Sequence, residues 1–167
     1  MVNTWYPVNW GLPVTGIFWD YENVPLRHDD WEGFLNGLAA FINANNIDFA
    51  RVYARETTMS DTDYDLISEL GVFSFKWVQS DDPNAADDSL IRSCIDVLES
   101  RGHINHILLI SGDGDFLELT DILLDWQVSV TLVCQQHNYN KALVGDVHRA
   151  YSVKFVASNP YNWWIRY

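Results

Sequence analysis

The sequence predicts an α/β fold, a three-layer sandwich in which helices cover a mainly parallel β-sheet. Short apolar runs alternate with longer segments of helical periodicity along the chain, which is the pattern of consecutive βα units. A length of 167 residues and a hydrophobic content of 48% suit one packed domain. No internal repeat, low-complexity linker or charge shift marks a second domain. We therefore expect a single domain over residues 1–167, with a core at about 14–157 and aromatic extensions at both ends.

The first half of the chain contains three expected strands and two expected helices. The run VTGIFW is typical of a fully buried strand, and Phe34, Leu38 and Phe41 repeat at helical spacing. In chain order we expect a strand at 14–19, a helix at 31–42, a strand at 49–53, a short helix at 63–70 and a strand at 72–78.

The second half repeats the alternation. The run NHILLI is the clearest buried strand, and Phe116, Leu119 and Leu123 fall at helical spacing. We expect a helix at 85–100, a strand at 105–110, a helix at 115–126, a strand at 128–133, a helix at 139–150 and an edge strand at 154–157.

The charge of the chain restricts its partners. There are 23 Asp and Glu against 10 Lys and Arg, a formal net charge of -13. A broad basic face for nucleic acid is therefore excluded, because Lys and Arg supply most of that affinity. Either the partner is not a polyanion, or another group such as a divalent metal supplies positive charge.

The sequence also indicates where the protein resides. Residues 1–10 lack the basic and apolar regions of a signal peptide, and no stretch approaches the ~20 apolar residues of a membrane span. Cys94 and Cys134 show no metal-ligand spacing and are interpreted as reduced and structural. We expect a soluble, cytoplasmic protein that does not contact a membrane.

Carboxylates follow two of the expected buried strands directly. Asp20 comes after the first strand, and Asp113 and Asp115 come after the 105–110 strand in the sequence SGDGD. Ligands of an open parallel sheet collect at the carboxyl ends of its strands. We therefore expect these acids to meet at one edge of the sheet.

Asp87 and Asp88 form a third group of acids, in the first turn of the expected helix at 85–100. Asp87 lies one turn before Ile91, on the side of the helix expected to face the sheet. Asp88 is about 100° further round and in line with Arg92. The helical phase predicts that Asp87 belongs to the site, with Asp88 beside it and paired with Arg92.

Two interpretations of these acids are open. Asp is common at helix N-termini, where it caps free N–H groups, and capping alone accounts for Asp87, Asp88 or Asp115 taken singly. Capping does not account for Asp20 and Asp113. Neighbouring carboxylates raise one another's pKa unless a cation lies between them, and oxygen ligands select hard ions. We expect one or two Mg²⁺ or Mn²⁺ ions that activate water for attack on a phosphate ester.

Three motifs follow one another along the chain: IFWDYENVP at 17–25, NAADDSLIRS at 84–93 and LLISGDGDFLELTDIL at 108–123. Together they resemble the NYN domain family of the PIN-like nuclease superfamily, and most closely its limkain-type, meiosis-regulator branch. The resemblance implies a Rossmann-like fold with core strand order 3-2-1-4-5 and a metal-dependent ribonuclease site. The positions that match are Asp20 with Asn23, Asp87 with Asp88, and Asp113 with Asp115. Asn84 stands where many bacterial members have a lysine, which removes a phosphate-binding cation.

The resulting hypothesis is an endoribonuclease that hydrolyses RNA phosphodiesters. Asp20, Asp87 and Asp113 would be catalytic and bind the principal ion, with the catalytic Asp115 and Asp88 as further metal ligands or supports. Asn23 and Ser111 would orient the scissile phosphate or the attacking water. Single-stranded RNA is favoured, because a narrow cleft needs a strand that can be splayed, and DNA is not excluded.

Few cations are placed to contact a phosphate backbone. The candidate substrate-binding residues follow expected strands and are Arg27, Arg55 and Lys141, the last with His137. The alternative for each is that it is an ordinary surface charge in solvent. His103 and His106 have HxxH spacing, but they stand at the amino end of a strand, opposite the acids, and are not expected to be ligands.

Two other functions are alternatives to the nuclease. A non-catalytic RNA- or protein-binding module is disfavoured by the intact acid set. A phosphatase of the haloacid-dehalogenase type would need an Asp at the position of Glu22. The aromatic runs at 5–10 and 161–167 are interpreted as caps on the core, with a stacking platform for bases as the alternative. A homodimer through these termini, and a protein partner that supplies specificity, are left open.

Overall fold

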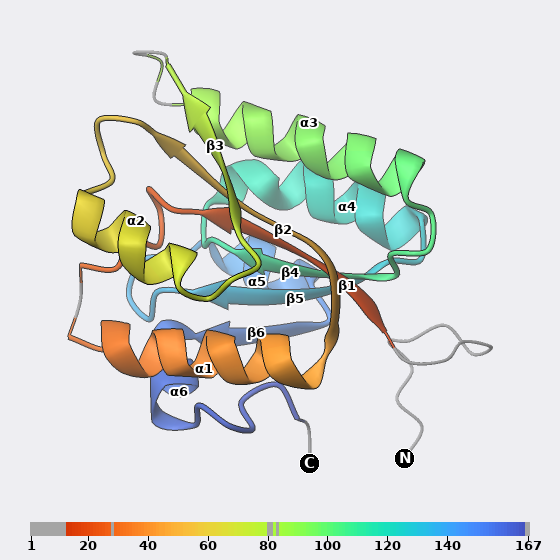
Figure 1. The fold of residues 1–167 in the computed structure, drawn as a ribbon. Helices are drawn as coiled ribbons and strands as arrows, with labels where there is room; N and C mark the ends of the chain where they lie inside the picture. The colour runs from red at the N-terminus through yellow and green to blue at the C-terminus, as the bar shows by residue number, and fades with distance from the viewer. Residues whose placement is uncertain (1–12, 28, 80–81, 83, 166–167) are drawn as a thin grey trace.

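A six-stranded, all-parallel sheet forms the centre of the computed structural model, which describes residues 13–27, 29–79, 82 and 84–165 (Figure 1). The strand order is β3-β2-β1-β4-β5-β6. The expected order 3-2-1-4-5 is confirmed, with β6 added at one edge. The strands are β1 Val14–Asp20, β2 Asn46–Arg55, β3 Ser74–Val78, β4 His106–Ile110, β5 Ser129–Cys134 and β6 Arg149–Ser152.

Helices cover both faces of the sheet. Figure 1 shows α3 (Ala85–Ser100) and α4 (Leu117–Asp125) on one face and α1 (Trp31–Ala44) and α6 (Val153–Ser158) on the other. The remaining elements are α2 (Asp61–Ser68), α5 (Lys141–Asp146) and a 3₁₀ turn, Gly114–Phe116. None of the helices in the described part of the chain is long and apolar enough to cross a membrane.

Burial on both faces explains the continuous apolar runs. Successive side chains of a strand point to opposite faces, so Phe18 of β1 joins the cluster under α3 and α4, whereas Ile17 and Trp19 join the cluster under α1. Every residue of β4 and of β5 is buried. A parallel sheet covered on both sides therefore needs apolar residues at consecutive positions.

The chain after β5 differs from the prediction. The expected strand at 154–157 is wrong, because these residues lie in α6, and the expected helix at 139–150 is limited to α5. Ser152 caps α6 by accepting a hydrogen bond from the backbone N–H of Phe155 at 3.0 Å. Val153 and Val156 are buried while Phe155 is exposed, which is helical rather than alternating burial. The edge strand is instead β6, whose Arg149 is in register with Thr131 of β5.

The described part of the C-terminal extension covers the core. Trp163 is buried, its indole N–H donates to the carbonyl of Gly37 at 2.9 Å, and its ring stacks on Phe41 with centroids 5.2 Å apart. The capping interpretation is therefore confirmed for Trp163, whereas the aromatic run at 5–10 lies outside the described residues.

The histidines and cysteines that were not expected to bind a metal have structural surroundings. His106 is buried between the hydroxyls of Thr15 and Thr131, at 2.9 and 2.8 Å. His103 pairs with Asp48 on the surface. Both cysteines are buried and free, as expected.

Candidate metal centre

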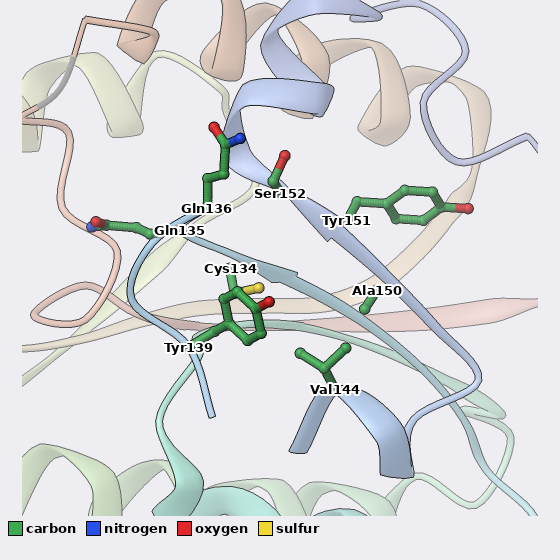
Figure 2. A pocket seen from close by; sticks show the side chains of 8 residues that line it. All are labelled: Cys134, Gln135, Gln136, Tyr139, Val144, Ala150, Tyr151 and Ser152. Atoms are coloured by element: carbon green, nitrogen blue, oxygen red, sulfur yellow. The ribbon is translucent and has the colours of Figure 1, made fainter. Parts of the chain in front are cut away.

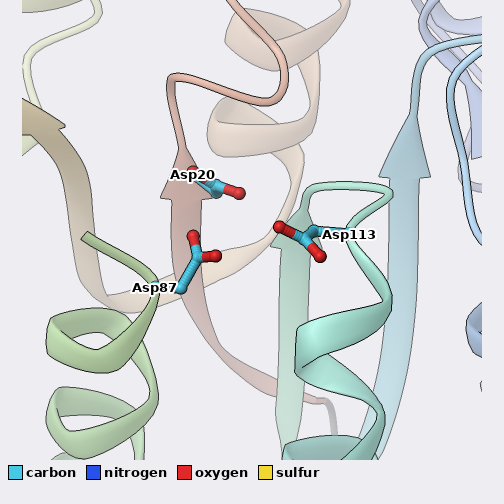
Figure 3. Close-up of side chains that lie close together, drawn as sticks. All are labelled: Asp20, Asp87 and Asp113. Atoms are coloured by element: carbon cyan, nitrogen blue, oxygen red, sulfur yellow. The ribbon is translucent and has the colours of Figure 1, made fainter. Parts of the chain in front are cut away.

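Three aspartates converge at the carboxyl edge of the sheet (Figure 3). Asp20 is the last residue of β1, Asp113 lies in the loop after β4, and Asp87 lies in the first turn of α3. One carboxylate oxygen of each lies within 4.8 Å of those of the other two. Asp20 and Asp87 are buried and Asp113 is half-buried. We call these three residues the acidic cluster.

The topology brings the acidic cluster together. β1 and β4 are parallel neighbours with Trp19 opposite Ile110, so the residues that follow both strands emerge side by side. Asp87 continues the buried face of α3 that includes Leu90 and Cys94, as the helical phase predicted. The burial of the helix against the sheet therefore directs its first carboxylate to the end of β1.

Ser111 positions two members of the acidic cluster. Its hydroxyl donates to Oδ2 of Asp20 at 2.9 Å and accepts from the backbone N–H of Asp113 at 3.1 Å. Ser111 is fully buried. The hydroxyl therefore holds a carboxylate from β1 and the loop after β4 in a fixed relation.

The acidic cluster is electrostatically unfavourable without a cation. Burial, followed by the charges of Asp113 and Glu22, raises the pKa of Asp20 from 3.8 to about 7, against the lowering effect of the Ser111 hydrogen bond. The pKa of Asp87 is raised well above its ordinary value by burial and by the charges of Asp20 and Asp113. A set of hard oxygen donors that repel one another fits a divalent ion such as Mg²⁺ or Mn²⁺.

The other two predicted acids lie outside the acidic cluster. Asp115 is exposed, and its backbone N–H donates to Oδ1 of Asp113 at 2.9 Å. Its charge contributes to the raised pKa of Asp87, which places it near the rim of the site. Asp88 is exposed and forms no ion pair with Arg92, so that predicted pair is wrong.

Asn23 joins three loops at the rim. Its side-chain oxygen accepts from the backbone N–H of Gly112 at 2.7 Å, and its carbonyl accepts from the side-chain amide of Gln135 at 3.0 Å. Two of the loops follow β1 and β4, and Gln135 follows β5. This cross-linking role was not anticipated, because the partners are distant in the sequence.

The predicted phosphate-binding cations differ in their surroundings. Arg55 is paired with Glu22, with Nε 3.1 Å from the carboxylate. Arg27 is exposed and donates to the carbonyl of Thr58 at 3.2 Å, and Lys141 is exposed at the start of α5. Glu22, two residues after Asp20, therefore both anchors Arg55 and adds negative charge near the acidic cluster, a role that the sequence reasoning missed.

Gly112 permits a close approach between two rim loops. A Cβ atom at this position would lie 2.7 Å from the carbonyl oxygen of Asn138 and 2.9 Å from Cβ of Tyr139. We expect Gly112→Ala to lower the free energy of unfolding by about 1–3 kcal/mol through overpacking, measured by chemical denaturation. Gly145→Ala in α5, with nothing within 4 Å of the added atom, is the matched control and should be neutral or slightly stabilising. Equal stabilities of the two variants would contradict this account of the loop contact.

The fold is shared with a solved structure. A crystal structure of a protein of unknown function from Vibrio parahaemolyticus superposes with a TM-score of 0.64 at 18% sequence identity. The similarity covers 84% of this chain and 93% of that chain. At this identity the likeness concerns the fold alone. A search of the curated proteins finds no matching sequence.

A family model matches this chain over most of its length. The matched segment runs from the first residue of β1 into the start of α6, and it contains all three residues of the acidic cluster. The model of the NYN domain matches residues 14–154, and the chain belongs to the NYN domain family.

Proposed function

We propose that the protein is a metal-dependent endoribonuclease that hydrolyses phosphodiester bonds of single-stranded RNA at the acidic cluster. Membership of the NYN domain family indicates a nuclease. The observation that carries the proposal is the convergence of Asp20, Asp87 and Asp113, with ligand oxygens within 4.8 Å of one another. No Lys, Arg or His of the described residues forms an ion pair with these acids. A structural role would be better served by neutral side chains, since the charges disfavour folding when no cation is bound.

Each member of the site has a distinct part in the proposed chemistry. Asp20, Asp87 and Asp113 would hold Mg²⁺ or Mn²⁺, which supplies a Lewis acid for phosphate oxygens and makes water a stronger nucleophile at neutral pH. The Ser111 hydroxyl holds Asp20 and the loop that carries Asp113 in fixed positions relative to each other. Asp115 and Asp88, exposed near the start of their helices, are proposed as outer supports or ligands of a second ion.

The proposed substrate contacts come from segments at or after the carboxyl ends of β1, β2 and β5. Arg27 and Lys141 are exposed and would meet phosphates on either side of the scissile bond. Arg55 would act partly through Glu22, which keeps its guanidinium at the rim. Asn23 sets the position of the Gly112 backbone, so its effect on substrate would be exerted through that loop.

The net charge of -13 restricts how RNA is held. Long-range attraction of a polyanion is weak for such a protein, so we expect affinity to depend on the divalent ion and on local contacts. The three strings at 17–25, 84–93 and 108–123 are the basis for proposing that the chain belongs to the limkain-type, meiosis-regulator branch of the family. A protein partner that presents the RNA is consistent with the small number of exposed cations.

Cleavage assays test the proposal directly. Labelled single-stranded RNA, double-stranded RNA and single-stranded DNA of one sequence would be incubated with the protein over a range of Mg²⁺ and Mn²⁺ concentrations, with EDTA as the control. We expect internal cuts, fastest in single-stranded RNA and absent in EDTA. Binding of RNA without a cut at any metal concentration would instead indicate a non-catalytic module.

A further inference from the structure

A cavity of about 220 Å³ opens at the carboxyl ends of β5 and β6, on the same edge of the parallel sheet as the acidic cluster (Figure 2). Its wall includes Cys134 and Gln135 at the end of β5, Gln136 and Tyr139 in the following loop, and Ser152 at the end of β6. Val144 of α5 and Ala150 of β6 supply apolar surface. Among the residues that the structure describes, no charged side chain lines this cavity.

Two contacts connect this cavity to the acidic cluster. The backbone of Tyr139 lies against Gly112, the residue directly before Asp113. The side-chain amide of Gln135 donates to the carbonyl of Asn23, three residues after Asp20. The loop that lines the cavity is therefore in direct contact with the loops that follow β1 and β4 and carry Asp20 and Asp113.

The cavity presents an aromatic ring and an unpaired amide. Tyr139 is 43% exposed, and its ring contacts no other aromatic ring among the described residues. The side chain of Gln136 is exposed and has no hydrogen-bond partner within the described part of the chain. In Figure 2 the Tyr139 ring lies in front of Cys134, and the side chain of Gln135 extends away from the Tyr139 ring.

The geometry points to a subsite for one unpaired nucleobase of the substrate strand, an inference that rests on the proposed ribonuclease function. A base stacks on an exposed aromatic ring whatever its sequence, and an amide can both donate to and accept from its edge. A neutral wall suits a base, whereas the phosphate that follows it belongs at the acidic cluster. The volume lies below the ~300 Å³ at which pockets for drug-sized ligands begin, as expected for a single base.

The subsite makes a prediction about RNA affinity. Tyr139→Ala is expected to raise KM for single-stranded RNA about 5- to 150-fold with little change in kcat, the range for loss of one stacked base. Tyr139→Phe retains the ring and should behave like the unchanged protein. Tyr161→Ala, which removes a tyrosine that is 76% exposed outside the cavity, is the matched control. Circular dichroism would confirm that each variant is folded.

An abasic substrate separates stacking from other effects. A series of RNAs would each lack one base, at successive positions around the cut. For the unchanged protein, the RNA that lacks the base bound in the subsite should have a raised KM. Tyr139→Ala should cause no further rise in KM for that RNA, because no base is present to stack. If Tyr139→Ala leaves KM unchanged while metal-dependent cleavage persists, the subsite is refuted and the nuclease stands.

Binding without cleavage gives an independent test. Adenosine, guanosine, cytidine and uridine, which carry no phosphate, would be titrated in EDTA while the side-chain amide resonances of Gln136 are followed by NMR. A saturable shift that disappears in Tyr139→Ala supports the subsite even if no RNA is cut, in which case the proposed function alone fails. No shift with any of the four nucleosides refutes the subsite.

Discussion

Replacing Asp20 with asparagine is expected to reduce metal-dependent RNA cleavage by more than about a hundredfold, since loss of even outer partners of metal ligands costs about 10- to 100-fold. Asp20 is 2% exposed and hydrogen-bonded to Ser111, so the isosteric amide keeps the shape of the site. It loses the negative charge that attracts the ion. Initial rates at saturating Mn²⁺ on single-stranded RNA would measure the effect, with thermal unfolding as the check on folding.

The matched control is Asp96→Asn, which removes the same charge from an exposed position of α3. Its rate should lie close to that of the unchanged protein, because it does not face the acidic cluster. Titration of Mn²⁺ against thermal stability adds a second readout, in which Asp20→Asn should lose the stabilisation by the ion. Full cleavage by Asp20→Asn from a preparation free of contaminating nuclease would refute the proposed mechanism.

Stability without divalent ions is expected to fall as the pH rises from about 4 to about 7. The folded-state pKa of Asp20 is raised from 3.8 to about 7, so across this interval the unfolded chain releases a proton that the folded protein retains. The free energy of unfolding therefore decreases with pH, and it levels off once the carboxyl is ionised in both states. At about 1.4 kcal/mol for each pKa unit the change for Asp20 is on the order of 4 kcal/mol. Asp87 contributes in the same direction.

Urea denaturation in EDTA at pH 4 and pH 8 measures this change. Asp20→Asn should be less sensitive to pH and, at pH 8, more stable than the unchanged protein, because it carries no buried charge. Saturating Mn²⁺ should remove most of the decrease by stabilising the ionised acids. A free energy of unfolding in EDTA that is the same for both proteins at pH 8 would show that the acids are not destabilising.

Much of the fold was predictable because it depends on local patterns. β1, β4 and β5 are largely apolar runs that are buried at nearly every position, and α3 has a regular buried face, so their positions follow from the sequence pattern. The region after β5 was not predictable in the same way. Its short elements are decided by the caps at Asn140 and Ser152 and by the pairing of Arg149 with β5. A six-residue helix and a four-residue strand carry too few apolar positions for periodicity to distinguish them.

The sequence by itself determined which acids stand at the ends of buried strands, and the helical phase that turns Asp87 rather than Asp88 inward. These properties depend on neighbours a few residues away. The tertiary structure decided that three carboxylates approach within 4.8 Å, that Ser111 bonds to Asp20 across 91 residues of chain, and that Arg55 is held by Glu22. It also created the cavity at Tyr139, whose loop packs against Gly112. Contacts of this kind depend on how the strand ends are aligned across the sheet, and that alignment exists only in the folded chain.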